Sequence, residues 1–396
     1  MTSSTEYKRI LAVSLPENQS AFLLGPRKTG KTWFLKQTFS QSLYYDLLNT
    51  DLYLELLKTP GRLREEILAA DKEHTAHPII IDEIQLVPLL LNEVHWLIEN
   101  TGNRFILCGS SARKLRKNNA NMLGGRAWHY ELYPLCSIEI PDFDLLRALR
   151  NGLIPGHYNA VNPQKSIRSY ISTYLKEEIA AEGLERNLPQ FSRFLDAVSY
   201  QVGELVNFTK IASDCGVPSR AVKEYYQILV DTFLGYMLPP FVKRGGRETI
   251  ASTPKFYFFD TGIANTLSKQ TIQELKGSAA GKSFENFIFN ELSAWNSYFE
   301  KNVDFSFWRT KSGLEVDFIL NKGWAAIEVK ISNSISKTDL KGLFAFSEET
   351  GSRLLYLVCN EKRKRQINPG NGTAAVKVYP WKLFLQDLWS GKVLTM

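Results

Sequence analysis

Apolar residues in the first 155 positions alternate between short continuous runs and the three-to-four-residue spacing of helices. The continuous runs predict strands at 21–25, 42–47, 78–82, 104–109 and 129–132. Helical spacing lies between them, at 31–39, 63–70 and 89–100. Strands that alternate with helices are typical of an α/β sheet, so this stretch predicts a first domain over residues 1–155.

The rest of the chain changes character twice. Residues 156–270 are mostly helical in pattern and follow a connection rich in Pro, Asn and Gly at 153–164. Residues 271–396 return to mixed α/β character, with a long helix at 283–295 and then strands at 305–310, 315–320, 325–330 and 353–359. We therefore predict a helical second domain and an α/β third domain with these boundaries.

Composition narrows the class of protein. No run of 18 apolar residues occurs, and the N-terminal stretch has no long apolar core, so we expect a cytoplasmic protein without a membrane span. The four cysteines and five histidines are scattered, which argues against a zinc site or a disulfide framework. A net charge of +7 favours polyanionic partners where basic residues cluster.

The segment GPRKTGKT at 25–32 matches a phosphate-binding loop between a predicted strand and a predicted helix. Its glycines let backbone N–H groups approach phosphate oxygens, and the helix N-terminus adds partial positive charge. Lys31 would reach the β- and γ-phosphates of ATP, and the Thr32 hydroxyl would bind Mg²⁺. The predicted nucleotide-binding residues of this loop are Gly25, Pro26, Arg27, Lys28, Thr29, Gly30, Lys31 and Thr32.

The strand at 78–82 supplies the acidic partner of such a loop. Asp82 would hold Mg²⁺, and Glu83 would polarise the attacking water. The pairing of loop and acidic strand predicts an ATPase.

The strand at 104–109 ends in Ser110 and Ser111, either of which would sense the γ-phosphate unless they only form a turn. Arg113 and Arg126 are candidates to stabilise transition-state charge, in their own chain or in a neighbouring subunit of a homo-oligomeric ring. The alternative for each arginine is a solvated surface role.

The pattern of apolar residues at 207–233 is typical of a helix-turn-helix, with Gly216 at the turn. Arg220 and Lys223 would lie on the exposed start of the second helix, where DNA readers place their contacts. A two-stranded wing would follow, with basic residues at its tip: Lys243, Arg244 and Arg247. The alternative is a helical packing module that contacts protein.

The C-terminal stretch places Asp317 on one strand and Glu328 with Lys330 on the next. Residues two apart on a strand share a face, and a hairpin would bring Asp317 beside them. Two carboxylates could bind Mg²⁺ while the lysine stabilises charge at a phosphodiester, with Glu285 completing the metal shell. A charged, solvated strand face is the alternative. The basic run at 362–365 could contact backbone phosphates, with a solvated loop as its alternative.

Together these motifs resemble the prokaryotic AAA-type ATPases that carry the C-terminal domain of unknown function 4143. The segments that carry the resemblance are GPRKTGKT, IIIDEIQLVP, GSSARKL, GGRAWHYELYPL, SYISTYLKEEI, LVDTFLGYMLPP, KFYFFDTGIANTL, GKSFENFIFNEL and WRTKSGLEVDFIL with AAIEVK. The resemblance implies a P-loop AAA+-type domain, a winged helix and a restriction-endonuclease-like domain. At the γ-phosphate sensor position, where many AAA+ ATPases carry asparagine, this chain carries serine, as Ser110 or Ser111.

Three functional hypotheses follow. The first is an ATP-hydrolysing, DNA-binding ATPase with a metal-dependent nuclease-like module that acts in DNA processing. The second is a nucleotide-dependent switch whose C-terminal domains bind protein partners without cleavage. The third, a nucleotide or sugar kinase, leaves the C-terminal residues without a role.

Overall fold

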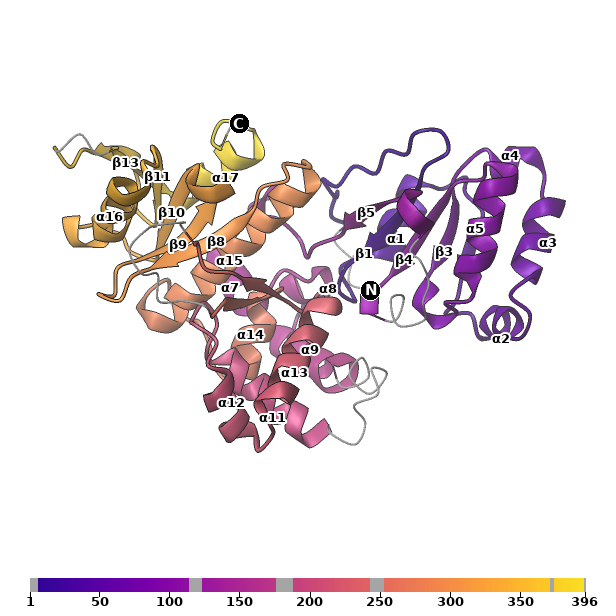
Figure 1. Cartoon of the computed structure of the whole chain (residues 1–396), viewed down its shortest axis with the longest axis horizontal. Coiled ribbons are helices and arrows are strands. Elements are labelled where there is room, and N and C mark those ends of the chain that lie inside the picture. The colour runs from indigo at the N-terminus through magenta and orange to yellow at the C-terminus, as the bar shows by residue number, and fades with distance from the viewer. Residues whose placement is uncertain (1–5, 114–122, 176–187, 243–252, 371–373, 395–396) are drawn as a thin grey trace.

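The computed structural model describes residues 6–113, 123–175, 188–242, 253–370 and 374–394. It places a sheet at each end of an elongated molecule and a helical segment between and below them (Figure 1). None of the described helices is long and apolar enough to cross a membrane.

The N-terminal sheet has five parallel strands in the order β2-β3-β4-β1-β5. They are β1 Ser20–Leu24, β2 Tyr44–Asp46, β3 Ile79–Asp82, β4 Phe105–Gly109 and β5 Ala127–Glu131. All residues of β1, β3 and β4 are buried, as expected of a parallel sheet with both faces covered. The predicted α/β sheet is therefore confirmed.

Helices cover this sheet on both sides. They are α1 Lys31–Thr38, α2 Thr50–Lys58, α3 Arg62–Ala69, α4 Lys72–Thr75 and α5 Leu90–Thr101, with short 3-10 turns at Ile84–Leu86, Leu123–Gly125 and Ser137–Glu139. Phe22 and Leu24 face a core shared with α3 and α5, whereas Ala21 and Leu23 face a core shared with α1. The core on the α1 side also contains residues of the helical segment and of the C-terminal part of the chain. One face of the N-terminal sheet therefore belongs to a core that all three parts share.

The helical segment comprises α7 Leu145–Asn151, α8 Pro155–Tyr158, α9 Pro163–Tyr170, a π-helical turn Ile171–Leu175, α11 Leu188–Ser199, α12 Phe208–Cys215, α13 Ser219–Asp231, β6 Gly235–Leu238, β7 Lys255–Phe258 and α14 Thr261–Leu267. The helix pair predicted from the sequence is present as α12 and α13. Gly216 has a φ of 67° at the turn, which glycine adopts without strain. The antiparallel pair β6–β7 follows, and its connecting residues Lys243, Arg244 and Arg247 lie outside the described residues.

The boundary expected at residue 155 falls at the start of α8 and after α7. Helix α7 packs against α14. Asp260 fixes this contact, because its carboxylate caps α14 at Ile263 N (3.0 Å) and accepts a bond from Leu153 N (2.6 Å). Burial raises the pKa of Asp260 to about 6.

The C-terminal part begins with the long helix α15 Gly277–Tyr298. A mixed six-stranded sheet follows in the order β12-β13-β11-β10-β9-β8. Its elements are β8 Phe305–Arg309, β9 Glu315–Leu320, β10 Ala325–Lys330, α16 Lys341–Thr350, β11 Leu354–Cys359, β12 Arg365–Ile367, β13 Val376–Pro380 and α17 Trp381–Trp389, with 3-10 turns at Asn321–Gly323 and Lys337–Leu340. Strands β9 and β10 are antiparallel neighbours, so the predicted hairpin is present.

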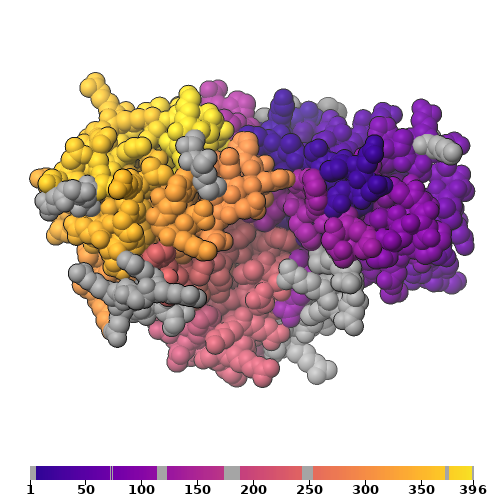
Figure 2. All heavy atoms as spheres, turned by 45° about the horizontal axis from the view of Figure 1, so that its top comes forward, coloured from indigo at the N-terminus to yellow at the C-terminus, as the bar shows by residue number. Residues whose placement is uncertain are grey.

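The N-terminal stretch joins the two ends of the molecule. In Figure 2 the indigo N-terminal residues lie where the purple part of the surface meets the orange part. Tyr7 and Leu11 are buried in the continuous core, and Tyr7 accepts a hydrogen bond from Asn159 of the helical segment.

Candidate functional site

The loop between β1 and α1 has a backbone that only glycine allows at two positions. Gly25 has a φ of 145°, and a Cβ there would lie 2.5 Å from the carbonyl oxygen of Leu132. Gly30 has a φ of 94° and immediately precedes α1. The loop therefore wraps tightly and ends at a helix N-terminus, which is the geometry that binds phosphate.

Lys31, the first residue of α1, is buried against its own loop. Its ammonium donates to the carbonyl oxygens of Gly25 and Pro26, each at 2.8 Å. Both partners are neutral, and no carboxylate of the described chain forms an ion pair with Lys31. The positive charge of this lysine is therefore held in place without being neutralised, as an anion site requires.

Thr32 and Asp82 meet directly. The Thr32 hydroxyl donates to Asp82 Oδ2 at 2.7 Å, and the same oxygen accepts a bond from the Tyr44 hydroxyl at 2.6 Å. Burial and the neighbouring Asp82 carboxylate raise the pKa of Tyr44, which keeps its hydroxyl a donor. A hydroxyl and a carboxylate in contact at the helix N-terminus are the oxygen ligands that Mg²⁺ prefers, so these residues fit Mg²⁺.

Glu83 lies next to this pair with a φ of 57°. Its carboxylate accepts a hydrogen bond from Gln85, whose amide also donates to Ser110 Oγ at 3.3 Å. Ser110 and Ser111 are both buried at the end of β4. The structure therefore joins the predicted water-polarising acid to one of the predicted sensor serines through Gln85, a residue that the sequence analysis did not select.

The two candidate arginines lie elsewhere. Arg126 precedes β5, which runs parallel to β1 from Ala127 opposite Ser20. It therefore lies at the opposite end of the strands from the loop, about six residues or 20 Å along the strand direction from Gly25. It ion-pairs with Glu99 there. Arg113 instead reaches the helical segment, where it pairs with Glu224 of α13 at 3.3 Å. The structure does not bring Arg126 to the loop of its own chain.

Arg9 connects the phosphate-binding loop with distant segments. Its guanidinium donates to the carbonyl oxygens of Thr29 (2.7 Å) and Tyr133 (2.7 Å) and to the hydroxyl of Tyr298 on α15 (3.2 Å). It also forms a buried ion pair with Glu139 at 3.0 Å. The Arg9 side chain therefore contacts the phosphate-binding loop, the segment after β5 and the end of α15.

The helical segment contacts the same loop from another side. The Tyr170 hydroxyl donates to the carbonyl oxygen of Arg27 at 3.4 Å, and Lys28 lies over the Tyr170 ring. His157 packs edge-on against that ring. Burial, reinforced by the charge of Lys28, lowers the pKa of His157 to about 4.

The predicted metal site at the other end of the molecule contains a lysine that the sequence analysis did not select. Lys255 Nζ lies 2.6 Å from Glu315 Oε1, 3.2 Å from Glu285 Oε1 and 3.6 Å from Asp317 Oδ1. Burial alone would lower the pKa of Lys255, but these carboxylates raise it well above its ordinary value. Burial and the Asp317 charge raise the pKa of Glu285 to about 7.

Glu328 is paired separately. Its Oε1 accepts from Lys330 Nζ at 2.7 Å, whereas Asp317 Oδ2 accepts from Val329 N at 2.9 Å. Over the part of the chain that the structure describes, no three or more His, Cys, Asp or Glu side chains are arranged to hold a metal ion. The predicted ligands Glu285, Asp317 and Glu328 therefore do not form a metal cage. Each of the three carboxylates has a lysine beside one of its oxygens: Lys255 lies beside Glu285 and Asp317, and Lys330 beside Glu328.

Arg220 and Lys223 are exposed on the first turns of α13, as predicted. Lys223 lies over the ring of Phe208 on α12, at 5.5 Å from the ring centroid. Of the basic run at 362–365, Lys364 pairs with Asp387 at 2.5 Å and Arg365 pairs with Glu361 at 2.7 Å.

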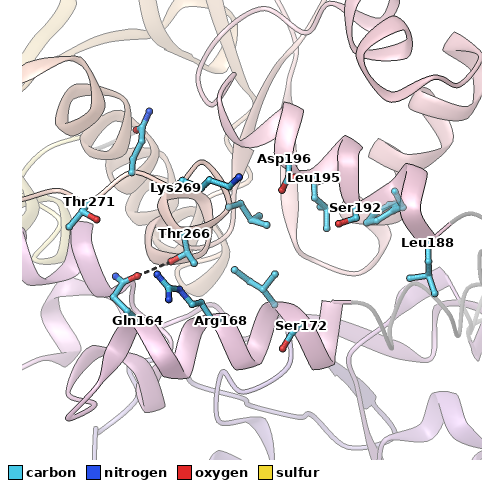
Figure 3. Close-up of a pocket in the computed structure, with 14 residues that line it drawn as sticks. Gln164, Arg168, Ser172, Leu188, Ser192, Leu195, Asp196, Thr266, Lys269 and Thr271 are labelled. Carbon is cyan, nitrogen blue, oxygen red and sulfur yellow. Dashed lines mark hydrogen bonds between the residues drawn. The ribbon is translucent and has the colours of Figure 1, made fainter.

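A cavity of about 490 Å³ lies within the helical segment, away from both sites. Figure 3 shows Gln164 and Arg168 of α9 on one side, with Ser192, Leu195 and Asp196 of α11 across from them. Among these lining residues, Thr266 donates a hydrogen bond to Gln164 at 3.5 Å. Its lining is not shared with the phosphate-binding loop.

Comparison with known proteins agrees with this division of the chain. Three family models match: an AAA domain at residues 17–140, a domain of unknown function 8612 at 142–274, and a domain of unknown function 4143 at 280–383. An uncharacterized protein of Methanocaldococcus jannaschii is 24% identical over 344 residues, which span 79% of this chain and 74% of that protein. One of Haemophilus influenzae is 25% identical over 275 residues, or 65% of this chain and 66% of its own length.

Among solved structures, the Aeropyrum pernix ORC1 protein in complex with DNA covers 63% of this chain and 86% of its own, at 13% identity and a TM-score of 0.26. A TM-score this low supports no functional argument. The family matches and the geometry of the loop agree, and the chain combines an N-terminal AAA domain with a C-terminal domain of unknown function 4143.

Proposed function

We propose that this chain binds and hydrolyses ATP with Mg²⁺ at residues 25–32 and passes its nucleotide state to a DNA-contacting helical segment. The observation that carries the proposal is the environment of Lys31. Its buried charge faces only neutral carbonyl oxygens, so it is available to an anion at a helix N-terminus. An AAA domain implies nucleotide as that anion.

Each residue of the site has a distinct role in this proposal. Lys31 and the loop N–H groups bind phosphate, and Thr32 with Asp82 would hold Mg²⁺, which neutralises phosphate charge when bound. Tyr44 keeps the Asp82 carboxylate oriented. Glu83 orients and polarises the attacking water, and Gln85 positions Glu83 relative to Ser110.

The contacts of the loop explain how its state would reach other segments. The Lys31 ammonium has three donors, and its bonds to the Gly25 and Pro26 carbonyl oxygens use two of them, so a bound phosphate would share this ammonium with the loop. The same loop is held by Arg9, which also bonds α15, and by Tyr170 of α9. A change in the loop therefore changes the free energy of its contacts with both later parts of the chain.

The helical segment offers the most direct DNA contact. Arg220 and Lys223 are exposed at the start of α13, and the next residue, Glu224, pairs with Arg113 three residues after Ser110. The chain carries a net charge of +7. Basic residues on an exposed helix start bind backbone phosphates, and this binding weakens with salt.

ATP turnover measured with and without duplex, single-stranded and branched DNA tests the proposal. We expect DNA to raise the rate at low salt. Lys223→Glu should lower DNA affinity and reduce the salt slope by about one. Lys58→Glu, the same charge change on the exposed surface of α2, is the matched control. A rate and an affinity that no DNA changes would refute the DNA part, and absent ATP turnover would refute the ATPase part.

A second candidate is a nucleotide-dependent switch that binds a protein partner. The pairing of Glu224 with Arg113 favours it, because this ion pair already connects α13 to the AAA domain right beside Arg220 and Lys223. Partner binding that depends on nucleotide and is insensitive to salt would support this candidate over DNA binding. A ring in which Arg126 serves a neighbouring subunit stays a prediction, which sedimentation with and without nucleotide tests.

A further inference from the structure

The acid cluster of the C-terminal sheet contains a lysine from a different part of the chain. Lys255 opens β7, far from the sheet in sequence, yet it is only 1% exposed. Its ammonium lies within 3.6 Å of three carboxylates, those of Glu285, Glu315 and Asp317. These come from α15 and β9, so the lysine joins three elements at one point.

The surroundings hold the lysine in place. Lys255 pairs with Leu238 of β6 in the ladder and forms a bridge with Leu205. Two residues along, on the same face of β7, the Tyr257 hydroxyl donates to Glu285 Oε1 at 2.6 Å. A Cβ at Gly203 would lie 2.9 Å from that same oxygen, so the backbone of Gly203 packs closely against the Glu285 carboxylate. The lysine and its acceptors are therefore packed together and are not loose surface groups.

Ammonium and divalent metal ions compete for the same carboxylate oxygens. Two of the three predicted metal ligands, Glu285 and Asp317, already face the Lys255 ammonium. The third, Glu328, is bound to Lys330 through Oε1, and its Oε2 is buried without a hydrogen-bond partner. All three carboxylates therefore already have an ammonium partner, and a divalent ion could gather their oxygens only by displacing both lysines.

We infer that Lys255 is the resident cation of this cluster and that it excludes a divalent metal. The nuclease-like arrangement then serves as an ion cluster that ties β7 of the helical segment to α15 and β9 of the C-terminal sheet. Such a cluster performs no metal-dependent hydrolysis. The inference does not depend on ATP or DNA binding at the other sites.

Calorimetric titration of the nucleotide-free full-length chain with Mn²⁺ tests this inference, with folding followed by circular dichroism. The wild type should bind no stoichiometric Mn²⁺. Lys255→Met keeps the length of the side chain but removes its charge. This variant should gain one bound Mn²⁺, with an affinity at least about tenfold above any residual Mn²⁺ binding by the wild type. Adding Asp317→Asn to this variant should remove the gain.

Lys330→Met is the matched control, because it deletes the other lysine of the cluster and leaves Lys255 in place. It should gain no Mn²⁺ site. Stoichiometric Mn²⁺ binding by the wild type that Asp317→Asn abolishes would overturn the inference, and this measurement does not depend on whether Lys255→Met folds. A folded Lys255→Met chain that binds no Mn²⁺ would also overturn it.

Discussion

The phosphate-binding loop and the C-terminal acid cluster contain the same kinds of group but in opposite electrostatic situations. Each has a buried lysine, and each has a tyrosine hydroxyl that donates to a carboxylate at 2.6 Å. Lys31 faces two neutral carbonyl oxygens, whereas Lys255 faces three carboxylates. A lysine held by neutral groups retains its charge for a ligand, and a lysine held by acids is neutralised within the fold.

Removing each lysine in turn should give the largest contrast. Lys31→Ala should reduce ATP turnover by roughly 10²–10³-fold, because its buried charge is the one that can meet the phosphates. Lys255→Ala should leave turnover within about threefold at a temperature where the chain stays folded. Steady-state ATPase assays on both variants check this. Equal losses of turnover in two folded variants would break the comparison.

Arg9 tests the claim that the loop is built into the whole molecule. Arg9→Met should lower the free energy of unfolding by about 3 kcal/mol, because Glu139 would be left as a buried, unpaired charge. Arg62 is the surface control. It also pairs with acids but is half exposed, so Arg62→Met should cost less than about 1 kcal/mol. Urea denaturation measures both, and similar values would remove the argument for a buried connection.

The pH dependence of stability should report on His157 beside the loop. Its pKa is lowered to about 4 in the folded chain, below the ordinary value of 6.5. A lowered pKa gives stability that is present above pH 6.5 and is lost as pH falls toward 4. Between pH 7 and 4.5 the loss should be about 2 kcal/mol.

His157→Phe, which keeps the ring against Tyr170, should remove most of that loss. His77→Phe, at an exposed histidine, should leave it in place. Urea midpoints measured from pH 4.5 to 7 provide the data. An unchanged slope in His157→Phe would show that another group causes the acid sensitivity.

The two tyrosines give the smallest and sharpest comparison. Tyr44→Phe and Tyr257→Phe each remove one hydroxyl donor to a carboxylate and should each cost about 1 kcal/mol of stability. Only Tyr44→Phe should also change nucleotide affinity, because only Asp82 lies at the loop. Fluorescent-nucleotide titration separates them. A shift in affinity for Tyr257→Phe alone would contradict the assignment of the two sites.

Local features of the chain predict much of this fold. Strands β1, β3 and β4 of the N-terminal sheet follow from buried apolar runs, and the loop follows from the spacing of Gly25, Gly30 and Lys31. The hairpin of β9 and β10 follows from alternation around a short turn.

Contacts between residues far apart in sequence could not be predicted in this way. Lys255 lies in the apolar run KFYFF, and its partners Glu285 and Asp317 are distant in sequence, so no spacing rule connects them. Arg9 likewise has partners throughout the chain. The place of Arg126, in contrast, follows once β5 is known to run parallel to β1. A residue just before β5 then lies at the start of the strands, whereas the loop after β1 lies at their other end.

Counting the Mn²⁺ ions bound per chain, with and without a non-hydrolysable ATP analogue, tests the difference between the two sites most directly. Equilibrium dialysis of the full-length protein gives this number. The account predicts no bound ion without nucleotide and one with it, held by Thr32 and Asp82 and lost in Asp82→Asn. One ion in the absence of nucleotide, or none in its presence, would contradict it.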